Sequence, residues 1–302
     1  MTENHERRPD EFSLELQLIA NEMRHDIITM LEAAGSGHPG GSLSCADIMS
    51  VLWFGGVMNY DQTTPKSDGR DVFILSKGHV APALYTAYHK LSWVKGDELL
   101  TLRKLGSRLQ GHPDSTKLEP VEVCTGSLGQ GLAIANGVAL GFKLDAQKTQ
   151  EAPRKAFCLL GDGEMQEGSN WEAIMFAAHK KLDNLVAIVD INGLQIDGPV
   201  DEVCSLGDLR AKFEAFGWHV ENADGHNVDE LLRAFDAVSA VEGRPSVILC
   251  ESVKGKGVSF MENQVGWHGN APSAEQAAQA IAELDAERDR LTAELEEVRH
   301  GN

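Results

Sequence analysis

The segment of residues 157–198 constrains the fold of this chain more than any other part of the sequence. Two apolar runs, residues 156–160 and 185–191, flank a stretch in which apolar positions recur at helical spacing: Trp171, Ile174, Met175, Ala178 and Leu182. Ser169 followed by Glu172 has the pattern of a capping box at the start of that helix. Strand, helix and strand in this order predict one unit of a parallel sheet.

Three other segments have the composition of buried strands: residues 72–75, 121–124 and 247–251. Most of the five predicted strands are short apolar runs without clean alternation, as expected for parallel strands that are covered on both faces. We therefore expect an α/β fold, a parallel sheet with helices on both faces, over residues 1–272. Residues 273–302 differ, because they are rich in Ala, Glu and Arg with a narrow apolar stripe near heptad spacing. They predict a separate charged helix that docks on its own domain or, less favoured, on a partner.

Charge and cysteine content exclude several classes of protein. The 302 residues carry 27 basic and 46 acidic side chains, and the net charge of −19 repels nucleic acid and anionic membranes. We expect no membrane span, because no long uncharged apolar run is present. Residues 1–11 are polar, unlike a secretory signal. Five scattered cysteines without a Cys-x-x-Cys pair argue against a disulfide framework or a zinc site, so we expect a cytosolic protein.

Polar side chains follow the two central predicted strands. Gly161-Asp162-Gly163 ends the first, and Asp190-Ile191-Asn192 ends the second. Neighbouring parallel strands would place the Asp162 carboxylate and the Asn192 amide at one edge of the sheet, where they would suit Mg²⁺ or Ca²⁺. Gly163 would let the backbone approach a diphosphate closely. A structural turn is the alternative, while the dinucleotide and Walker glycine patterns do not fit this spacing.

The order of Gly-Asp-Gly, a helix and an Asn after a second strand resembles the thiamine-diphosphate signature. The resemblance implies that Asp162, Asn192 and the backbone carbonyl of Leu194 bind the metal, and that Gly163 contacts the diphosphate. It also explains how an acidic protein could hold a diphosphate, since the metal neutralises its charge.

Four histidines in glycine-rich or turn-like contexts extend this resemblance. They lie in Gly37-His38-Pro39-Gly40, Lys77-Gly78-His79, Gly111-His112-Pro113 and Trp267-His268-Gly269, and a fifth motif spans residues 125–131. Their order and spacing resemble transketolases over roughly residues 14–271. The other histidines need no special role.

The family resemblance implies a role for each of these positions. His79 and His268 would touch the diphosphate and the donor, and His112 would touch the first hydroxyl of the donor. His38 and His268 would serve the hydroxyl whose proton leaves. The Gly126 carbonyl would hold the aminopyrimidine. Imidazole suits such work, because it donates and accepts hydrogen bonds near neutral pH.

The resemblance also indicates what this chain does not supply. In the family, the glutamate that bonds the aminopyrimidine and the arginines that bind sugar phosphates lie on a second, pyrimidine-binding domain. The chain ends soon after the first domain and begins with Met1, so we expect a natural N-terminal subunit with a separate C-terminal partner, assembled as α₂β₂. Ser127 stands where single-chain transketolases often carry proline, and the loop Lys254-Gly255-Lys256-Gly257 and residues 76–85 resemble the split-subunit branch more closely. Glu167 and Glu172 match acidic positions near the subunit contact, although a capping box explains Glu172 equally well.

The expected activity is transfer of a two-carbon ketol unit from a ketose, phosphorylated or not, to an aldose acceptor. Thiamine diphosphate and Mg²⁺ or Ca²⁺ are the expected cofactors. Two alternatives remain at this point: a non-catalytic or regulatory subunit that retains the fold, or a related two-carbon transferase similar to deoxyxylulose-phosphate synthases.

Overall fold

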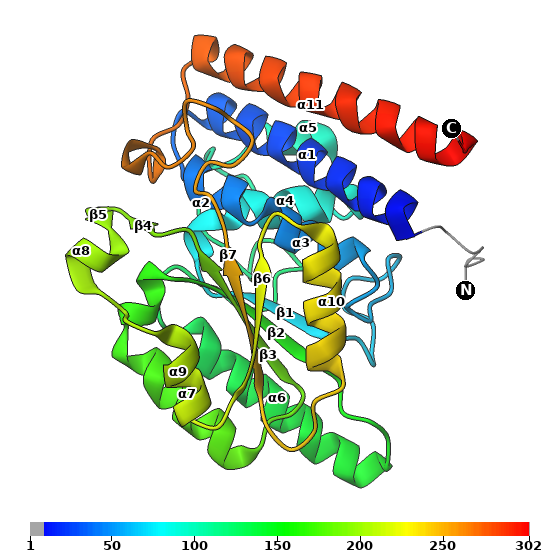
Figure 1. Cartoon of the computed structure of the whole chain (residues 1–302), viewed down its shortest axis with the longest axis vertical. Coiled ribbons are helices and arrows are strands. Elements are labelled where there is room, and N and C mark those ends of the chain that lie inside the picture. The colour runs from blue at the N-terminus through cyan, green and yellow to red at the C-terminus, as the bar shows by residue number, and fades with distance from the viewer. Residues whose placement is uncertain (1–8, 302) are drawn as a thin grey trace.

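A five-stranded sheet forms the centre of the computed structural model, which describes residues 9–301 (Figure 1). The strand order is β1-β2-β3-β7-β6, and each neighbouring pair is parallel. The strands are β1 (Val72–Leu75), β2 (Ala156–Gly161), β3 (Leu185–Ile191), β6 (His219–Asp224) and β7 (Ser246–Glu251).

Both faces of this sheet are buried under helices. In β2, Phe157 and Leu159 belong to one apolar cluster, while Cys158 and Leu160 belong to the cluster on the opposite face. The first face is covered by α1 (Pro9–Ala34), α2 (Pro39–Ser44), α3 (Ala46–Phe54), α4 (Ala81–Lys90), α10 (Val228–Ser239) and α11 (Ala274–His300). The second face is covered by α6 (Gly131–Thr149), α7 (Gly168–Lys180) and α9 (Leu209–Ala215). The predicted α/β fold is therefore confirmed.

Short elements connect these layers. They are the 3₁₀ turns η1 (Gly78–Val80), η2 (Gly163–Gln166) and η3 (Val265–Trp267), the helices α5 (Gly96–Leu99) and α8 (Val200–Cys204), and an antiparallel ribbon of β4 (Leu194–Gln195) with β5 (Gly198–Pro199). None of the helices within residues 9–301 combines the length and apolar composition that crossing a bilayer requires.

Two strand predictions differ from the structure. Residues 121–124 form no strand, because their backbone takes part in turns: the Val121 N–H bonds to the Leu118 carbonyl. Strand β6 was not expected from the sequence. It lies at the edge of the sheet, and only Val220 and Ala223 among its six residues are buried, so it lacks the apolar run that marks the central strands.

The start of α7 also differs from the prediction. The helix begins at Gly168 with Glu167 as its N-cap, and no side chain caps it. The Ser169 hydroxyl instead donates to the Gly129 carbonyl at 2.8 Å, so the capping box predicted for Ser169 and Glu172 is wrong. The predicted apolar stripe is wrong at one position, since Met175 is 58% exposed.

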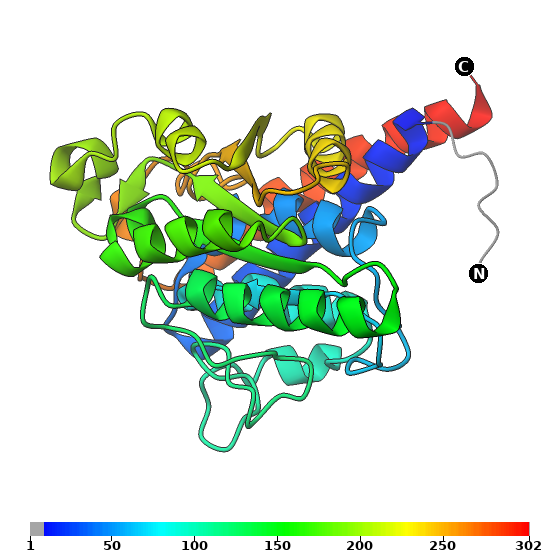
Figure 2. The same ribbon diagram turned by 90° about the horizontal axis from the view of Figure 1, so that it is seen from below.

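The C-terminal helix α11 docks on its own chain. It lies alongside α1 in both views (Figures 1 and 2). Leu14 packs with Leu291 and Leu295 between the two helices, and Arg299 forms ion pairs with Glu11 and Glu15. A capping box at Ser273, which involves Gln276, fixes where this helix begins.

Candidate functional site

Four histidines from four separate segments meet beyond the carboxyl ends of the strands. They are His38 before α2, His79 in η1, His112 in the loop between α5 and α6, and His268 after η3. The ring centroid of His38 lies 5.2 Å from that of His79, 5.6 Å from that of His268 and 6.2 Å from that of His112. The rings of His79 and His268 stack at 5.3 Å. The structure thus brings together all four histidines that the sequence singled out.

Glycines allow the loops around these rings to approach each other. A Cβ built on Gly126, whose φ is +153°, would lie 3.1 Å from the His112 ring. A Cβ on Gly78 would lie 2.7 Å from the Thr125 hydroxyl, which is buried without a hydrogen-bond partner. The predicted Gly126 therefore lies beside His112 at the histidine cluster, where a larger residue would separate the two loops.

The histidine cluster is held in its neutral form. Burial, followed by the nearby Arg103 charge, lowers the pKa of His38 to about 4. Burial, followed by the Lys254 charge, lowers the pKa of His268 to about 4. The pKa values of His79 and His112 are also lowered, chiefly by burial. Neutral imidazoles keep one nitrogen free to accept a proton or a hydrogen bond at pH 7.

The predicted metal ligands lie together at the carboxyl edge of β2 and β3. Gly161 pairs with Asp190 across the two strands, so Asp162 follows one strand beside the residues that follow the other. The Gly193 N–H donates to the Asp162 carboxylate at 2.6 Å, and the Leu194 N–H donates to the Asn192 amide oxygen at 3.2 Å. Gly163 opens η2, and a Cβ on it would lie 3.1 Å from the Gln195 side chain.

The charge of Asp162 fits a bound cation. The carboxylate is only 3% exposed, and its hydrogen bonds come from two backbone N–H groups, those of Gly163 and Gly193. Burial, followed by repulsion from Asp190, raises the pKa of Asp162 to about 6. Among residues 9–301, no group of three His, Cys, Asp or Glu side chains could hold a metal. The proposed set needs only one, because amide and carbonyl oxygens complete it.

Two buried lysines join this site, and sequence reasoning did not assign them a role. Lys77 donates to the Asp190 carboxylate at 2.5 Å, and both side chains are buried. Burial alone would lower the pKa of Lys77, but the Asp190 charge holds it above its usual value. A signal for this pair was present, because a carboxylate inside the apolar strand 185–191 requires a buried cation.

The second lysine connects the two halves of the site. Lys254 is 2% exposed, and its ammonium lies 2.9 Å from both the Leu194 carbonyl oxygen and Nδ1 of His268. Burial, followed by repulsion from Lys77, lowers the pKa of Lys254 to about 8. The predicted metal-ligand carbonyl and the histidine cluster are therefore neighbours, with one cation between them.

A buried carboxylate that was not predicted fixes the glycine loops. Glu164, which is 2% exposed, accepts hydrogen bonds from the Ser76 hydroxyl at 2.5 Å and from the Gly129 N–H at 2.9 Å. It also accepts one from the Gly161 N–H. The loop of residues 125–131 is thereby tied to the ends of β1 and β2.

The chain matches the family described as "Transketolase, thiamine diphosphate binding domain" over residues 16–296. The chain belongs to this family. It is 39% identical over 277 residues to the 6-deoxy-6-sulfo-D-fructose transketolase subunit of Clostridium sp. (strain MSTE9), and the match covers 92% of this chain and 98% of that protein. It is 38% identical to an apulose-4-phosphate transketolase subunit of Phocaeicola vulgatus, with 93% of this chain and 97% of that protein covered.

The structure agrees with this assignment. A solved transketolase from Leishmania mexicana superposes with a TM-score of 0.82 at 28% identity, over 93% of this chain and 45% of that one. The chain likewise spans only 43% of the transketolase of Pongo abelii, to which it is 42% identical. It therefore corresponds to less than half of the single-chain enzymes, but to nearly the whole of relatives that are called subunits.

Proposed function

We propose that this chain is the N-terminal subunit of a split transketolase, which transfers a two-carbon ketol unit from a ketose to an aldose acceptor. The observation that carries the proposal is the position of Lys254, which bonds both His268 and the Leu194 carbonyl. One continuous site thus has a charged end suited to a diphosphate with its metal, and a neutral end suited to proton transfer.

At the charged end, Asp162, Asn192 and the Leu194 carbonyl would hold Mg²⁺ or Ca²⁺, and the Gly163 backbone would contact the diphosphate. The buried carboxylate of Asp162, whose hydrogen bonds come from two backbone N–H groups, supports this role. Lys254 would turn from the Leu194 carbonyl toward the diphosphate. When bound, thiamine diphosphate supplies the carbanion chemistry that cleaves and remakes the carbon–carbon bond.

At the neutral end, the four histidines would act on the sugar. His79 and His268 would contact the cofactor and the donor, His112 would bind the first hydroxyl of the donor, and His38 with His268 would accept the hydroxyl proton. The Gly126 carbonyl, beside His112, would position the aminopyrimidine. Neutral imidazoles are suited to these steps, because a general base must be unprotonated before it acts.

A substrate with an anionic group, such as a sugar phosphate, agrees with the surroundings of the histidines. The exposed Arg103 lies next to them: a Cβ on Gly111 would be 2.9 Å from its guanidinium carbon. Within residues 9–301, its side chain forms no hydrogen bond or ion pair, so its charge is available to a ligand. The names of the two bacterial relatives refer to a sulfonated and a phosphorylated sugar.

The second wall of the site would come from a separate C-terminal subunit with the pyrimidine-binding domain, in an α₂β₂ assembly in the cytosol. Full coverage of proteins named as subunits supports this partner. Helices α6 and α7, which pack together, expose Leu144, Met175 and Phe176, and these side chains are available to an interface.

The test is reconstitution. The chain would be purified alone and together with a candidate pyrimidine-binding-domain chain from the same organism, and both samples would be assayed with Mg²⁺, thiamine diphosphate, xylulose 5-phosphate and ribose 5-phosphate. We expect no ketol transfer from the chain alone and activity from the pair. Full activity of the chain alone would contradict the split enzyme, and a pair that is inactive on phosphorylated and sulfonated ketoses would favour a regulatory subunit.

A further inference from the structure

The loop that carries Lys254 is held at three other positions. The Ser252 N–H donates to the Ile191 carbonyl at 2.9 Å, and the Gly255 N–H donates to the Gly40 carbonyl at 2.9 Å. Between them, the Val253 N–H donates to Nε2 of His226 at 2.8 Å. Two of these anchors are backbone carbonyls, whereas the third is an imidazole from the turn between β6 and α10.

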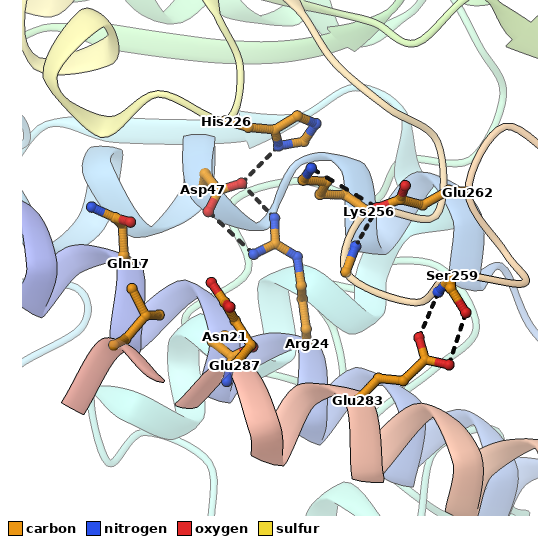
Figure 3. A pocket seen from close by; sticks show the side chains of 12 residues that line it. Gln17, Asn21, Arg24, Asp47, His226, Lys256, Ser259, Glu262, Glu283 and Glu287 are labelled. Carbon is orange, nitrogen blue, oxygen red and sulfur yellow. Dashed lines mark hydrogen bonds and ion pairs between the residues drawn. The ribbon is translucent and has the colours of Figure 1, made fainter. Parts of the chain in front are cut away.

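The ring of His226 is fixed from its other side as well. Because Nε2 accepts a hydrogen bond, the proton lies on Nδ1, which donates to the Asp47 carboxylate at 2.8 Å. Asp47 is in turn paired with both terminal nitrogens of Arg24 in α1 (Figure 3). These three side chains therefore form one continuous series of hydrogen bonds from α1 to the backbone of Val253.

The charged side chains in this series are buried, and the negative charge of Asp47 is paired with the positive charge of Arg24. Asp47 is 5% exposed and Arg24 is 6% exposed. Burial alone would raise the pKa of Asp47, but the Arg24 charge and the His226 hydrogen bond lower it to about 2. Asp47 is thus an ionised acceptor at neutral pH, which holds the ring in the tautomer that Val253 requires.

His226 does not face the substrate site. It lines a separate cavity of about 410 Å³ between α1, α3, α11 and the loop of residues 256–262, together with Arg24, Asp47 and Lys256. None of the four site histidines lines this cavity. An effect of His226 on the reaction would therefore be indirect, and its hydrogen bond to Val253 places it one residue from Lys254.

We propose that His226 is a positioning residue, which fixes the backbone of Val253 and thereby holds Lys254 where its ammonium, now beside the Leu194 carbonyl and His268, can turn toward a bound diphosphate. The inference rests on the proposed function, since the placement of Lys254 matters only where a diphosphate is bound. Without the imidazole, the Val253 N–H would lose its acceptor, and the loop would have to shift to satisfy it. Lys254 is the next residue, and misplacements of about 1 Å in such sites can reduce rates by as much as 10²-fold.

Two substitutions separate positioning from mere packing. His226→Gln is long enough to place its amide oxygen where Nε2 lies, so it can still accept from Val253. His226→Asn reaches only the position of Nδ1, so it can donate to Asp47 but leaves Val253 without an acceptor. His219→Asn is the matched control, because His219 lies at the opposite end of β6 and bonds Glu221.

The variants would be compared in the complex with the partner chain by calorimetric titration with thiamine diphosphate in Mg²⁺, and by hydrogen exchange of the loop of residues 252–257. We expect His226→Asn to weaken cofactor affinity by roughly 10-fold and to accelerate exchange in the loop. We expect His226→Gln to stay within about threefold of the wild type, as a single retained hydrogen bond implies. The control should match the wild type in both measurements.

Equal affinities of the Asn and Gln variants, or loop exchange in His226→Asn at the wild-type rate, would overturn the positioning role. If His226→Asn does not fold, His226→Ala replaces it. That variant removes the Val253 acceptor altogether, and an unchanged affinity would again overturn the role. A wild-type complex that binds no thiamine diphosphate would refute the proposed function instead, and the exchange measurement would still decide whether His226 holds the loop.

Discussion

The two ends of the site differ in charge: the end with the four histidines is neutral, and the end at the carboxyl edge of β2 and β3 contains buried charges. At the histidine end, burial and nearby cations remove charge, so that His38, His79, His112 and His268 are neutral. At the other end, charged groups are buried in ionised form. Asp190 is fully buried, and its carboxylate accepts hydrogen bonds from Lys77, Ser44, Ser252 and Asn192.

This difference indicates that the two ends of the site have different roles. A group that accepts a proton must be unprotonated before it acts, and neutral imidazoles meet this condition. A group that holds a diphosphate and its metal must keep its charge, and it does so only where opposite charges and hydrogen-bond donors surround it. Removing a residue that contacts only the donor, such as His112, should therefore affect turnover, whereas removing one from the charged end should affect stability and cofactor binding.

The largest effect is expected at the neutral end. His112→Ala in the reconstituted enzyme should reduce turnover on ketose donors by roughly 10²–10⁴-fold, because an orienting and proton-transferring group is lost. Affinity for thiamine diphosphate should remain close to that of the wild type, as calorimetry can show. His89→Ala is the control, since its ring bonds the Val94 carbonyl at the end of α4. Loss of cofactor affinity together with turnover would break the contrast between the two ends.

A stability effect is expected at the charged end. Lys77→Met leaves the buried Asp190 carboxylate without its ion-pair partner, and the free energy of unfolding should fall by about 3–5 kcal/mol. Lys66→Met breaks the more exposed pair with Glu122, and it should cost at most about 1 kcal/mol. Urea denaturation of both variants measures the difference. Similar losses from the two would mean that burial does not set the strength of these pairs.

The smallest effect concerns the charge beside the histidines. Arg103 helps to lower the pKa values of His38 and His112, after burial. Since a base is active only when neutral, activity is lost as the pH falls through these pKa values. Arg103→Gln removes a repulsive charge and raises both pKa values, so the acidic limb of the kcat/KM profile should move to higher pH by less than about one unit. Lys104→Gln is the control, and a shift to lower pH in Arg103→Gln would contradict the assignment.

The sequence predicted those parts of the site that depend on local order. Asp162 and Asn192 end neighbouring apolar strands, and parallel pairing alone brings such ends together. The histidines lie in glycine motifs whose order resembles a known family. Lys254 could not be assigned in this way, because its loop reaches Leu194 and His268 only through the complete fold.

The wrong predictions of secondary structure have the same cause. Residues 121–124 have the composition of a strand, but the Val121 N–H bonds to the Leu118 carbonyl within a turn. The edge strand β6 has no apolar run, although it pairs with β7. Ser169 has the spacing of a cap, but its hydroxyl bonds Gly129, from a loop distant in sequence. In each case the structure depends on contacts made in the folded protein, and a local sequence pattern does not contain them.

The most direct test of the account is whether Asp162 makes cofactor binding depend on a metal. Thiamine diphosphate would be titrated into the complex of wild-type chain and partner with and without Mg²⁺, and then into complexes with Asp162→Asn and Asp201→Asn. Asp201 is the control, because it is exposed on α8 near the same strand ends.

We expect Mg²⁺ to tighten binding in the wild type and in Asp201→Asn. In Asp162→Asn, we expect affinity to fall by roughly 100-fold or more and the effect of Mg²⁺ to disappear, because the only carboxylate of the metal set is lost. Wild-type affinity and an unchanged Mg²⁺ dependence in Asp162→Asn would contradict the account.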